Sequence, residues 1–297
     1  MKNEWKIRMQ NNADLVNEAL AHYLETPDSD LSVLYESMRY SALSGGKRIR
    51  PFLVLEFCRM FGGEEKSALP FACAIECVHA SSLIHDDMPC MDDDDLRRGK
   101  PTNHVVFGED IALLAGDALI TKGYELAAEN PFVAPEIALG ATAMLLKNAG
   151  AIGMMGGQQI DLLGEKNPVA FSLLLKMHRK KTGALIIASA LLGCYAAGIS
   201  SREDERMKDA ALYAENIGLA FQVIDDILDA TSDDITLGKR VHADERMQKT
   251  TFLSEMSIEE AYAYAKQKTE TAVSAIEKYE NSKILIDFAR YLLERKK

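Results

Sequence analysis

A dense group of carboxylates in the first third of the chain is the first feature that could do chemistry. Asp86 and Asp87 are followed, after Met-Pro-Cys-Met, by the run from Asp92 to Asp95, so six acids lie within ten residues. Pro89 disfavours helical angles at the residue before it, which puts the later carboxylates on a loop just past a buried helix expected over 71–85. Hard cations such as Mg²⁺ and Ca²⁺ take oxygen ligands, and Mg²⁺ commonly bridges carboxylates to substrate phosphates. The cluster therefore predicts a cation site, with a solvated acidic loop as the alternative.

A second acidic group lies in the last third of the chain, inside a strongly apolar window. On a helix, Asp225 and Asp229 are four positions apart and Asp226 and Asp229 are three apart, so these carboxylates share one face. Like charges at this spacing destabilise a helix that binds no cation. A solvated face would intersperse lysines, yet Ile224 and Ile227 flank the acids, which favours a ligand site over a plain surface.

Basic residues next to glycines complement these acids. The segment GGKRIRP, residues 45–51, is expected to open a helix on which Lys47 and Arg50 share one face, and the free amides of a helix start favour an anion. A solvated basic first turn is the alternative. These groups indicate a diphosphate held by metal on one side and by guanidinium groups on the other. Further candidates are Arg97, Arg98, Lys100, Lys180, Lys181, Thr182, Lys239 and Lys249.

The composition is that of a globular protein with a sizeable core. Of 297 residues, 47% are hydrophobic and 27% charged, which excludes a disordered chain and a coiled-coil rod. The net charge of −11 argues against a nucleic-acid partner, because binding its phosphates needs a basic face. The five cysteines show neither a disulfide framework nor paired zinc spacing, and residues 1–10 show no export signal. We therefore expect reduced thiols and a cytoplasmic location.

Apolar residues repeat at intervals of three and four along the chain, which predicts helices and no substantial sheet. The longest uncharged run, 183–199, has 17 residues and suits a buried core helix better than a membrane span. Without a linker or a repeat, we predict one all-α domain of roughly ten helices over residues 1–297, and no stable membrane insertion. The expected breaks between helices are 26–30, 43–46, 62–63, 89–102, 130–131, 156–157, 164–168, 200–201 and 231–250.

The acidic and basic segments together resemble the trans-type isoprenyl diphosphate synthases, also called polyprenyl synthetases, of farnesyl and geranylgeranyl diphosphate synthase type. The family's first aspartate motif is DDxxxxD followed by LRRG, and its second is DDxxD. The resemblance runs from residue 37 to residue 252 and includes GGKRIRP, the GGQ of 156–158 with Asp161, the KTG of 181–183, and the LGK of 237–239. The ends of the chain add only length and an amphipathic pattern. The first aspartate motif is matched by Asp86, Asp87 and Asp92, with LRRG at residues 96–99. The second is matched by Asp225, Asp226 and Asp229.

This resemblance implies an all-α bundle around a central cavity, usually homodimeric, with the two aspartate motifs facing each other across its mouth. About three Mg²⁺ ions would sit there with the allylic diphosphate. The implied metal ligands are Asp86, Asp87, Asp92, Asp225, Asp226 and Asp229. The implied catalytic groups are Asp86, Asp87, Asp92, Asp225 and Asp226, together with Arg97, Lys181 and Lys239. Lys47, Arg50, His79 and Arg98 would hold isopentenyl diphosphate. Arg97, Lys181, Thr182, Gln222, Lys239 and Lys249 would contact the allylic substrate or close over it.

The implied reaction condenses isopentenyl diphosphate with dimethylallyl, geranyl or farnesyl diphosphate to give geranylgeranyl and/or farnesyl diphosphate. Magnesium and cationic side chains would neutralise the departing diphosphate, so that the allylic carbon–oxygen bond ionises and the alkene attacks the carbocation. A dry apolar cavity keeps water from capturing that cation. Two positions stay open: His79 could be a core histidine, and Phe252 stands where Tyr is usual, which puts a hydroxyl contact near Lys249 in doubt.

Other protein classes share some of these features. A class I terpene cyclase also carries DDxxD, but its second metal motif normally has an Asn/Ser/Glu pattern. A noncatalytic subunit of a heteromeric synthase should have lost one acidic motif, and this chain retains both. A calcium-binding or structural interaction protein would explain the acids but not the ordered basic motifs. An EF-hand is disfavoured because Leu96 and Arg97 stand where its loop needs an oxygen ligand and Gly.

Product length is expected to depend on the helix that precedes Asp86, along which the growing tail would run. In the bacterial farnesyl synthases that the chain resembles, the fifth residue before the first aspartate is typically a bulky aromatic, and here it is Ser81. We assign chain length to Ser81, Ser82 and Cys77, whose small side chains predict elongation to geranylgeranyl diphosphate. The alternative is a bulky residue on a neighbouring helix that closes the pocket and restores a farnesyl product.

Overall fold

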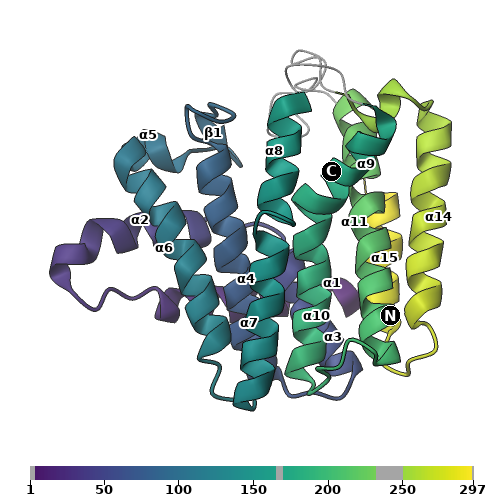
Figure 1. The fold of residues 1–297 in the computed structure, drawn as a ribbon, viewed down its shortest axis with the longest axis horizontal. Helices are drawn as coiled ribbons and strands as arrows, with labels where there is room; N and C mark the ends of the chain where they lie inside the picture. Colours follow the sequence, from purple (N-terminus) through teal and green to yellow (C-terminus); the bar gives the residue numbers. More distant parts are fainter. Residues whose placement is uncertain (1–3, 165–169, 232–249, 296–297) are drawn as a thin grey trace.

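The computed structural model describes residues 4–164, 170–231 and 250–295, and within these ranges the protein is built of helices (Figure 1). The one sheet among them is a short antiparallel hairpin of β1 (Leu96–Arg97) and β2 (Lys100–Pro101). The all-α prediction is therefore confirmed. The α-helices are α1 (Glu4–Tyr23), α2 (Ser32–Ala42), α3 (Ile49–Met60), α4 (Glu65–Asp86), α5 (Asn103–Phe107), α6 (Glu109–Ala128), α7 (Pro135–Ala149), α8 (Met154–Gly164), α9 (Phe171–His178), α10 (Ala184–Ala196), α11 (Glu205–Thr231), α14 (Ile258–Ile276) and α15 (Lys283–Glu294). Short helical turns are η1 (Ser29–Leu31), η2 (Arg179–Gly183) and η3 (Phe252–Ser254).

Helix α10 forms the centre of the bundle. Eleven of its 13 residues are buried, and it contacts α3, α4, α7 and α11. A helix that is apolar all round belongs in a core, and Figure 1 shows α10 enclosed between α7 and α11. The uncharged run 183–199 is therefore a core helix, as predicted.

Helices α4 and α11 carry the two aspartate motifs to the same end of the bundle (Figure 1). The helix expected over 71–85 is confirmed as α4, which begins six residues earlier, at Glu65, and ends at Asp86. Asp225, Asp226 and Asp229 all lie in the last two turns of α11. The carboxylates of both motifs are thus placed at helix C-termini, where the helix dipole disfavours anions and favours a bound cation.

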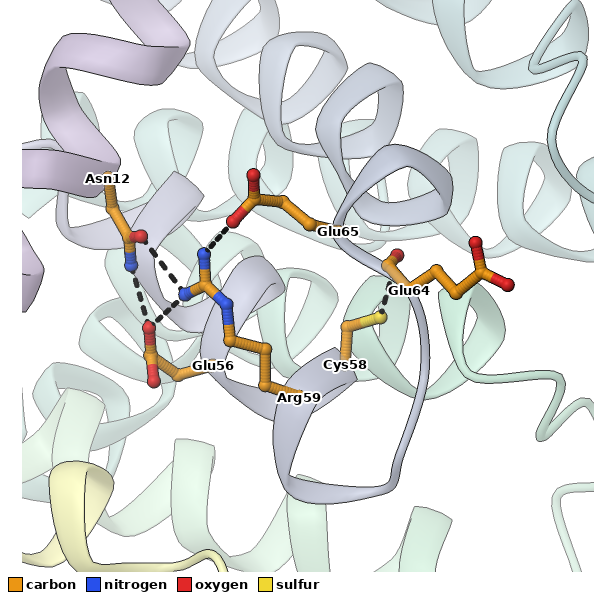
Figure 2. A network of polar contacts seen from close by, with 6 residues as sticks. All are labelled: Asn12, Glu56, Cys58, Arg59, Glu64 and Glu65. Atoms are coloured by element: carbon orange, nitrogen blue, oxygen red, sulfur yellow. Dashed lines mark hydrogen bonds and ion pairs between the residues drawn. The ribbon is translucent and has the colours of Figure 1, made fainter.

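The opposite end of α4 is fixed by a polar network between α1, α3 and α4 (Figure 2). Asn12 donates to Glu56 at 2.8 Å, and Arg59 donates to Asn12 at 3.0 Å while pairing with Glu56 and Glu65. Here each carboxylate has its own guanidinium or amide partner. This acidic cluster therefore holds helices together and is not a candidate for binding a cation.

One predicted break is wrong. Gly156 and Gly157 lie inside α8, and the chain turns earlier, between Ala149 and Met154. A Cβ at Gly157 would overlap the backbone nitrogen of Lys181, so this glycine allows α8 to touch η2 rather than forming a turn.

Two segments of the described residues are long and apolar enough to cross a membrane by length and composition alone. One is α4. Its most apolar stretch is 78% buried within the bundle, as in a core helix. The other runs through α7 and α8, residues 135–164, and only 39% of its window is buried. Its exposed apolar face needs a separate explanation.

Candidate active site

The first aspartate motif gathers at the C-terminal end of α4. Asp86 is half-buried, Asp87 is buried as the residue that caps the helix, and the Asp92 N–H donates to the Asp86 carbonyl oxygen at 2.9 Å. Burial raises the pKa of Asp86 to about 6; Lys181 opposes this shift and Asp92 adds to it. The chain thus holds carboxylates where desolvation and mutual repulsion make a bound cation favourable.

The β1–β2 hairpin returns Arg97 to this motif. Its Nε donates to both carboxylate oxygens of Asp87 at 2.8 Å, and its terminal nitrogen pairs with the same group. Burial raises the pKa of Asp87 even though Arg97 acts to lower it. Arg97, expected to contact the allylic substrate, is therefore joined directly to a predicted metal ligand.

The GGKRIRP segment differs from the expected helix turn in one respect. Helix α3 starts at Ile49, and Arg48 before it is left-handed, with φ of 48°, so Lys47 lies in the loop and not on a helix face with Arg50. Arg98 donates to the carbonyl oxygen of Gly45, which brings the LRRG segment onto this loop. The predicted basic groups are therefore gathered by a loop-to-loop contact.

Arg48 is a residue that the sequence reasoning missed. It is buried, pairs with Glu76 at 2.5 Å, and donates to Asn17 at 2.9 Å and to the Ala42 carbonyl oxygen at 2.6 Å. These contacts hold the backbone between Lys47 and Arg50. The available signal was Glu76, the one acid within the apolar stretch 71–85, because such a charge needs a buried partner.

Arg50 and His79 line the cavity from the basic side. Arg50 Nε is buried and has no hydrogen-bond partner among the described residues. Burial lowers the pKa of His79 well below its usual value, and Arg50 and Arg98 lower it further, so His79 is neutral at pH 7. A buried guanidinium donor with no partner, next to a neutral imidazole, suits an anionic oxygen ligand.

The cavity itself has a volume of about 450 Å³ and lies between α4, α6, α8 and η2. Asp86 and Lys181 stand at one end, which we call the mouth. Ser81 and Ser82 line the cavity, as predicted, but Cys77 is fully buried and does not belong to its lining. Packing between α4 and α6 encloses the Cys77 side chain, and its role in chain length stays a prediction. The neighbouring helices contribute Ile120, Met154, Met155, Gln158, Gln159 and Leu162.

The second aspartate motif is already engaged by the chain. Asp226 accepts the Phe252 N–H at 2.8 Å, and Gln222 donates to Asp225 at 3.4 Å. Asp229 Oδ1 is buried and accepts no hydrogen bond from the residues that the structure describes. Within the described ranges no three His, Cys, Asp or Glu side chains are arranged so that they could hold a metal ion. Mg²⁺ needs only one or two protein carboxylates, with water and substrate phosphate completing its shell, and the buried Asp229 oxygen is a suitable ligand of that kind.

The turn η2 links the two motifs. It is a π-helical turn, a form often found at functional sites, and it carries Lys181 and Thr182. Lys181 pairs with Asp161 of α8 at 2.5 Å, and Thr182 donates to Gln222 of α11 at 3.2 Å. The predicted residues Lys181, Thr182 and Gln222 are therefore brought together.

His178 is a second residue that the sequence reasoning missed. Its Nδ1 lies 3.1 Å from Gln222 Oε1, and its ring stacks on Phe252 with centroids 5.1 Å apart. Burial lowers the pKa of His178 to about 4. Phe252 is fully buried, so its ring serves as a packing surface for His178. The predicted contacts of Lys239 and Lys249 lie outside the described residues.

The C-terminal helix also reaches the site, which corrects the expectation that the chain ends add only length. Arg295, directly after α15, is 9% exposed and pairs with Asp225. Burial lowers the pKa of Lys47, Arg295 lowers it further and Asp225 opposes this, so Lys47 belongs to the same group of charges. No sequence spacing could have shown this contact, because 70 positions separate its partners.

The fold and site define a helical protein in which Asp86, Arg50 and Lys181 line one largely apolar cavity, with the second aspartate motif at the same end of the bundle but outside that lining. A family model described as polyprenyl synthetase matches residues 31–287. The chain belongs to the polyprenyl synthetase family, which confirms the resemblance drawn from the motifs.

The names of the relatives describe synthases whose products differ in length. The chain is 43% identical over 291 residues to heterodimeric geranylgeranyl pyrophosphate synthase large subunit 1, chloroplastic, of Arabidopsis thaliana, covering 95% of this chain and 77% of that one. It is 42% identical over 287 residues to farnesyl diphosphate synthase of Escherichia coli (strain K12), covering 95% of each. The apo crystal structure of an FPP/GFPP synthase from Zymomonas mobilis matches with a TM-score of 0.88 and 36% identity, over 99% of this chain and 100% of that one.

Proposed function

We propose that this protein is a prenyltransferase that condenses isopentenyl diphosphate with dimethylallyl, geranyl or farnesyl diphosphate, with geranylgeranyl diphosphate as its main product. One observation carries the proposal. The same cavity is lined by the Arg50 guanidinium, the neutral His79 imidazole, Asp86 and Lys181, and its other walls are largely apolar. Two diphosphates and one hydrocarbon tail match that distribution of charge and apolar surface.

Mg²⁺ fits the donors present, and Asp86, Asp87, Asp92, Asp225, Asp226 and Asp229 would hold about three ions together with the substrate's phosphate oxygens. When bound, the metal neutralises charge on the departing diphosphate. Arg97 and Arg295 already pair with Asp87 and Asp225, so the acids are held in position by cationic side chains in the structure described.

On the basic side, Arg50, Arg98 and Lys47 would bind the diphosphate of isopentenyl diphosphate, and neutral His79 would donate an N–H to it. The Arg48–Glu76 pair fixes the backbone between Lys47 and Arg50. Because the clamp acts on the end of the substrate remote from the alkene, its role is to bind and orient.

On the allylic side, Lys181 and Thr182 are positioned by Asp161 and Gln222. Their charge and hydroxyl face the mouth, where bond cleavage develops negative charge on the leaving group. The apolar walls contributed by Ile120, Met154 and Leu162 exclude water from the cation that remains.

The proposal is tested by incubating the purified protein with Mg²⁺, isopentenyl diphosphate and each allylic diphosphate, then measuring released pyrophosphate and sizing the products. We expect pyrophosphate release only when both substrates and Mg²⁺ are present. Hydrocarbon products without isopentenyl diphosphate would identify a terpene cyclase. No turnover by the protein alone would identify a noncatalytic subunit or a binding protein.

We propose geranylgeranyl diphosphate as the main product because Ser81 leaves the α4 wall of the cavity small. Ser81→Tyr should shift the product to farnesyl diphosphate, measured by chromatography of dephosphorylated products. A wild-type protein that makes only farnesyl diphosphate would refute the argument that the small Ser81 side chain leaves room for a longer product. A variant that still makes geranylgeranyl diphosphate would show that Ser81 does not limit the tail.

We propose a homodimer because the exposed apolar face on α6, α7 and α8 needs a partner. Single exposed apolar residues are ordinary, but a continuous set on neighbouring helices marks an interface. Light scattering on the purified protein should give twice the mass of one chain. The double variant Leu139→Asp with Leu146→Asp should lower the measured mass. The exposed side chains are Leu113, Leu114, Leu139, Leu146, Ile152, Met155 and Leu163, with Leu139 at 72%.

A cytoplasmic location remains part of the proposal. All five cysteines are free thiols, and four of them are buried, which suits a reducing compartment. Fractionation of cells that express the tagged chain should recover it with cytoplasmic markers, whereas recovery with a membrane fraction would contradict the proposal.

A further inference from the structure

His178, the last residue of α9, is joined to the site by a hydrogen bond to Gln222 of α11. Its Nδ1 lies 3.1 Å from Gln222 Oε1. The other ring nitrogen, Nε2, is buried and has no hydrogen-bond partner among the described residues. The ring packs on Phe252 and lies outside the lining of the cavity. Any effect of His178 on a substrate must therefore pass through its neighbours.

Gln222 connects three elements of the site. Its Oε1 also accepts the Thr182 hydroxyl of η2 at 3.2 Å, and its Nε2 donates to Asp225, one turn further along α11, at 3.4 Å. A side-chain amide has one acceptor oxygen with two lone pairs and one donor nitrogen. The oxygen thus faces both His178 and Thr182, while the nitrogen faces the second aspartate motif.

The charge of Asp225 fixes this orientation of the amide. Asp225 also pairs with Arg295, and an ionised carboxylate can only accept hydrogen bonds. Rotating the Gln222 amide by half a turn would place its oxygen against the carboxylate, so two acceptors would face each other. Because that contact is repulsive, the nitrogen must face Asp225 and the oxygen must face the ring of His178.

The orientation of the amide in turn fixes the hydrogen on the imidazole. An amide oxygen cannot donate, so Nδ1 of His178 must carry the hydrogen that joins them. Burial lowers the pKa of His178 to about 4, so at pH 7 the ring is neutral and has a single N–H. That N–H is used on Gln222, and Nε2 is left without a hydrogen.

We propose that His178 is a positioning residue, whose Nδ1–H holds the Gln222 amide with its NH₂ group toward Asp225. The inference rests on the proposed prenyltransferase function, in which Gln222 contacts the allylic diphosphate and Asp225 binds metal. A Gln222 free to rotate would turn its oxygen toward these negative groups. Holding the amide before the substrate arrives keeps a donor aimed where negative charge develops.

Two variants separate the hydrogen bond from the packing of the ring. His178→Asn keeps an N–H one bond beyond Cγ, as in Nδ1, but removes the ring from Phe252. His178→Phe keeps a ring there but removes the N–H. We expect His178→Phe to lower kcat/KM for the allylic diphosphate by about tenfold, and His178→Asn to stay within about threefold of the wild type. In urea unfolding the order should reverse, with His178→Asn the less stable variant.

A double-variant cycle tests whether the effect passes through Gln222. When Gln222→Ala has removed the amide, adding His178→Phe should lower kcat/KM by less than about twofold more, because residues that act through one contact are not additive. His22→Phe, on the exposed surface of α1, is the matched control and should leave both kcat/KM values unchanged.

The tautomer gives a readout that needs no turnover. Nitrogen NMR of the metal-free protein with ¹⁵N-labelled histidine shows which ring nitrogen carries the hydrogen, and the His178 signals are those that disappear in His178→Phe. We expect a protonated Nδ1 and an unprotonated Nε2 at pH 7.

An Nδ1–H tautomer together with an active His178→Asn and an impaired His178→Phe supports the proposal. A hydrogen on Nε2, or a His178→Phe variant as active as the wild type, overturns it and leaves the prenyltransferase function standing. Equal, additive losses in both variants would assign His178 to packing alone and also overturn it. An inactive wild-type protein overturns the proposed function itself, so the two failures are distinguishable.

Discussion

Arg295, which follows the last helix of the chain, pairs with Asp225 of the second aspartate motif and lies 4.1 Å from the centre of the Phe221 ring. Its guanidinium also donates to the Phe221 carbonyl oxygen at 3.0 Å. The end of α15 is thereby fixed to the helix that carries the motif. A site made from two acidic motifs and one basic loop thus includes the end of the described chain as well.

Asp86→Asn is expected to lower kcat by about 100-fold or more while the protein stays folded, because it removes a charge where metal and leaving group meet. Steady-state kinetics at several Mg²⁺ concentrations measures the loss, and thermal unfolding checks the fold. Asp95→Asn, on the exposed part of the same loop, is the control and should keep near-normal turnover. Normal turnover and Mg²⁺ dependence in Asp86→Asn would remove Asp86 from the site.

Lys47→Ala and Arg50→Ala are expected to raise KM for isopentenyl diphosphate by about 10–100-fold, the value of one charge-assisted hydrogen bond. The KM for the allylic substrate should change less, because the proposal assigns these groups to the diphosphate of isopentenyl diphosphate. Varying each substrate in turn separates the two constants. If the allylic KM alone rises, the two subsites are assigned the wrong way round.

Gly157→Ala is expected to lower stability by about 1–3 kcal/mol, because a methyl group there would overlap the Lys181 backbone. Activity should fall by more than stability explains, since Lys181 must move away from the mouth. Gly183→Ala is the control, because its added carbon would lie 3.5 Å from the His178 carbonyl oxygen, an ordinary contact. Urea unfolding and kcat are measured together, and equal effects of the two changes would contradict this account.

His178 is expected to make stability depend on pH. The folded pKa of about 4 lies below the ordinary 6.5, so between these values the unfolded chain binds more protons than the folded one. Titration of His178 therefore costs the protein no stability above pH 6.5. As the pH drops toward 4, it lowers the free energy of unfolding by at most roughly 3 kcal/mol. Asp86 acts in the opposite sense, because its pKa is raised to about 6.

The contribution of His178 is isolated by comparing the wild type with His178→Gln, which cannot titrate. Urea unfolding at a series of pH values should show a smaller loss of stability on acidification in the variant. His22→Gln, on the exposed surface of α1, controls for removing a histidine. Parallel curves for wild type and His178→Gln would show that burial of His178 does not affect its titration.

Arg295→Met is expected to destabilise the metal-free protein by about 1–3 kcal/mol, because Asp225 loses a buried guanidinium partner. The loss should shrink when Mg²⁺ and an allylic diphosphate are added, since bound cations then compensate the carboxylate. Arg290→Met, on the exposed face of α15, is the control. A loss that is the same with and without Mg²⁺ would mean that Arg295 supports packing alone.

Local patterns in the sequence were sufficient for the helices and for the residues that carry most of the chemistry. The period of three to four predicts α1 and α15, because burying one face of a helix requires that repeat, and the uncharged run 183–199 predicts α10. The spacing of Asp225, Asp226 and Asp229 places them on one face whatever the rest of the chain does. Gly156 and Gly157 were wrongly predicted to form a turn, because the sequence alone does not distinguish a glycine required for close helix packing from a glycine required for a bend.

Tertiary structure alone decided which of these residues meet. Arg48 with Glu76 and Arg295 with Asp225 join positions 28 and 70 residues apart, and no local spacing encodes such a contact. Cys77 was expected in the cavity because it is small, but Gly123 brings α6 against its turn of α4 and encloses it. Residue type predicts what a side chain can do; the packing of helices distant in sequence determines what it can reach, because that packing depends on shape along the whole interface.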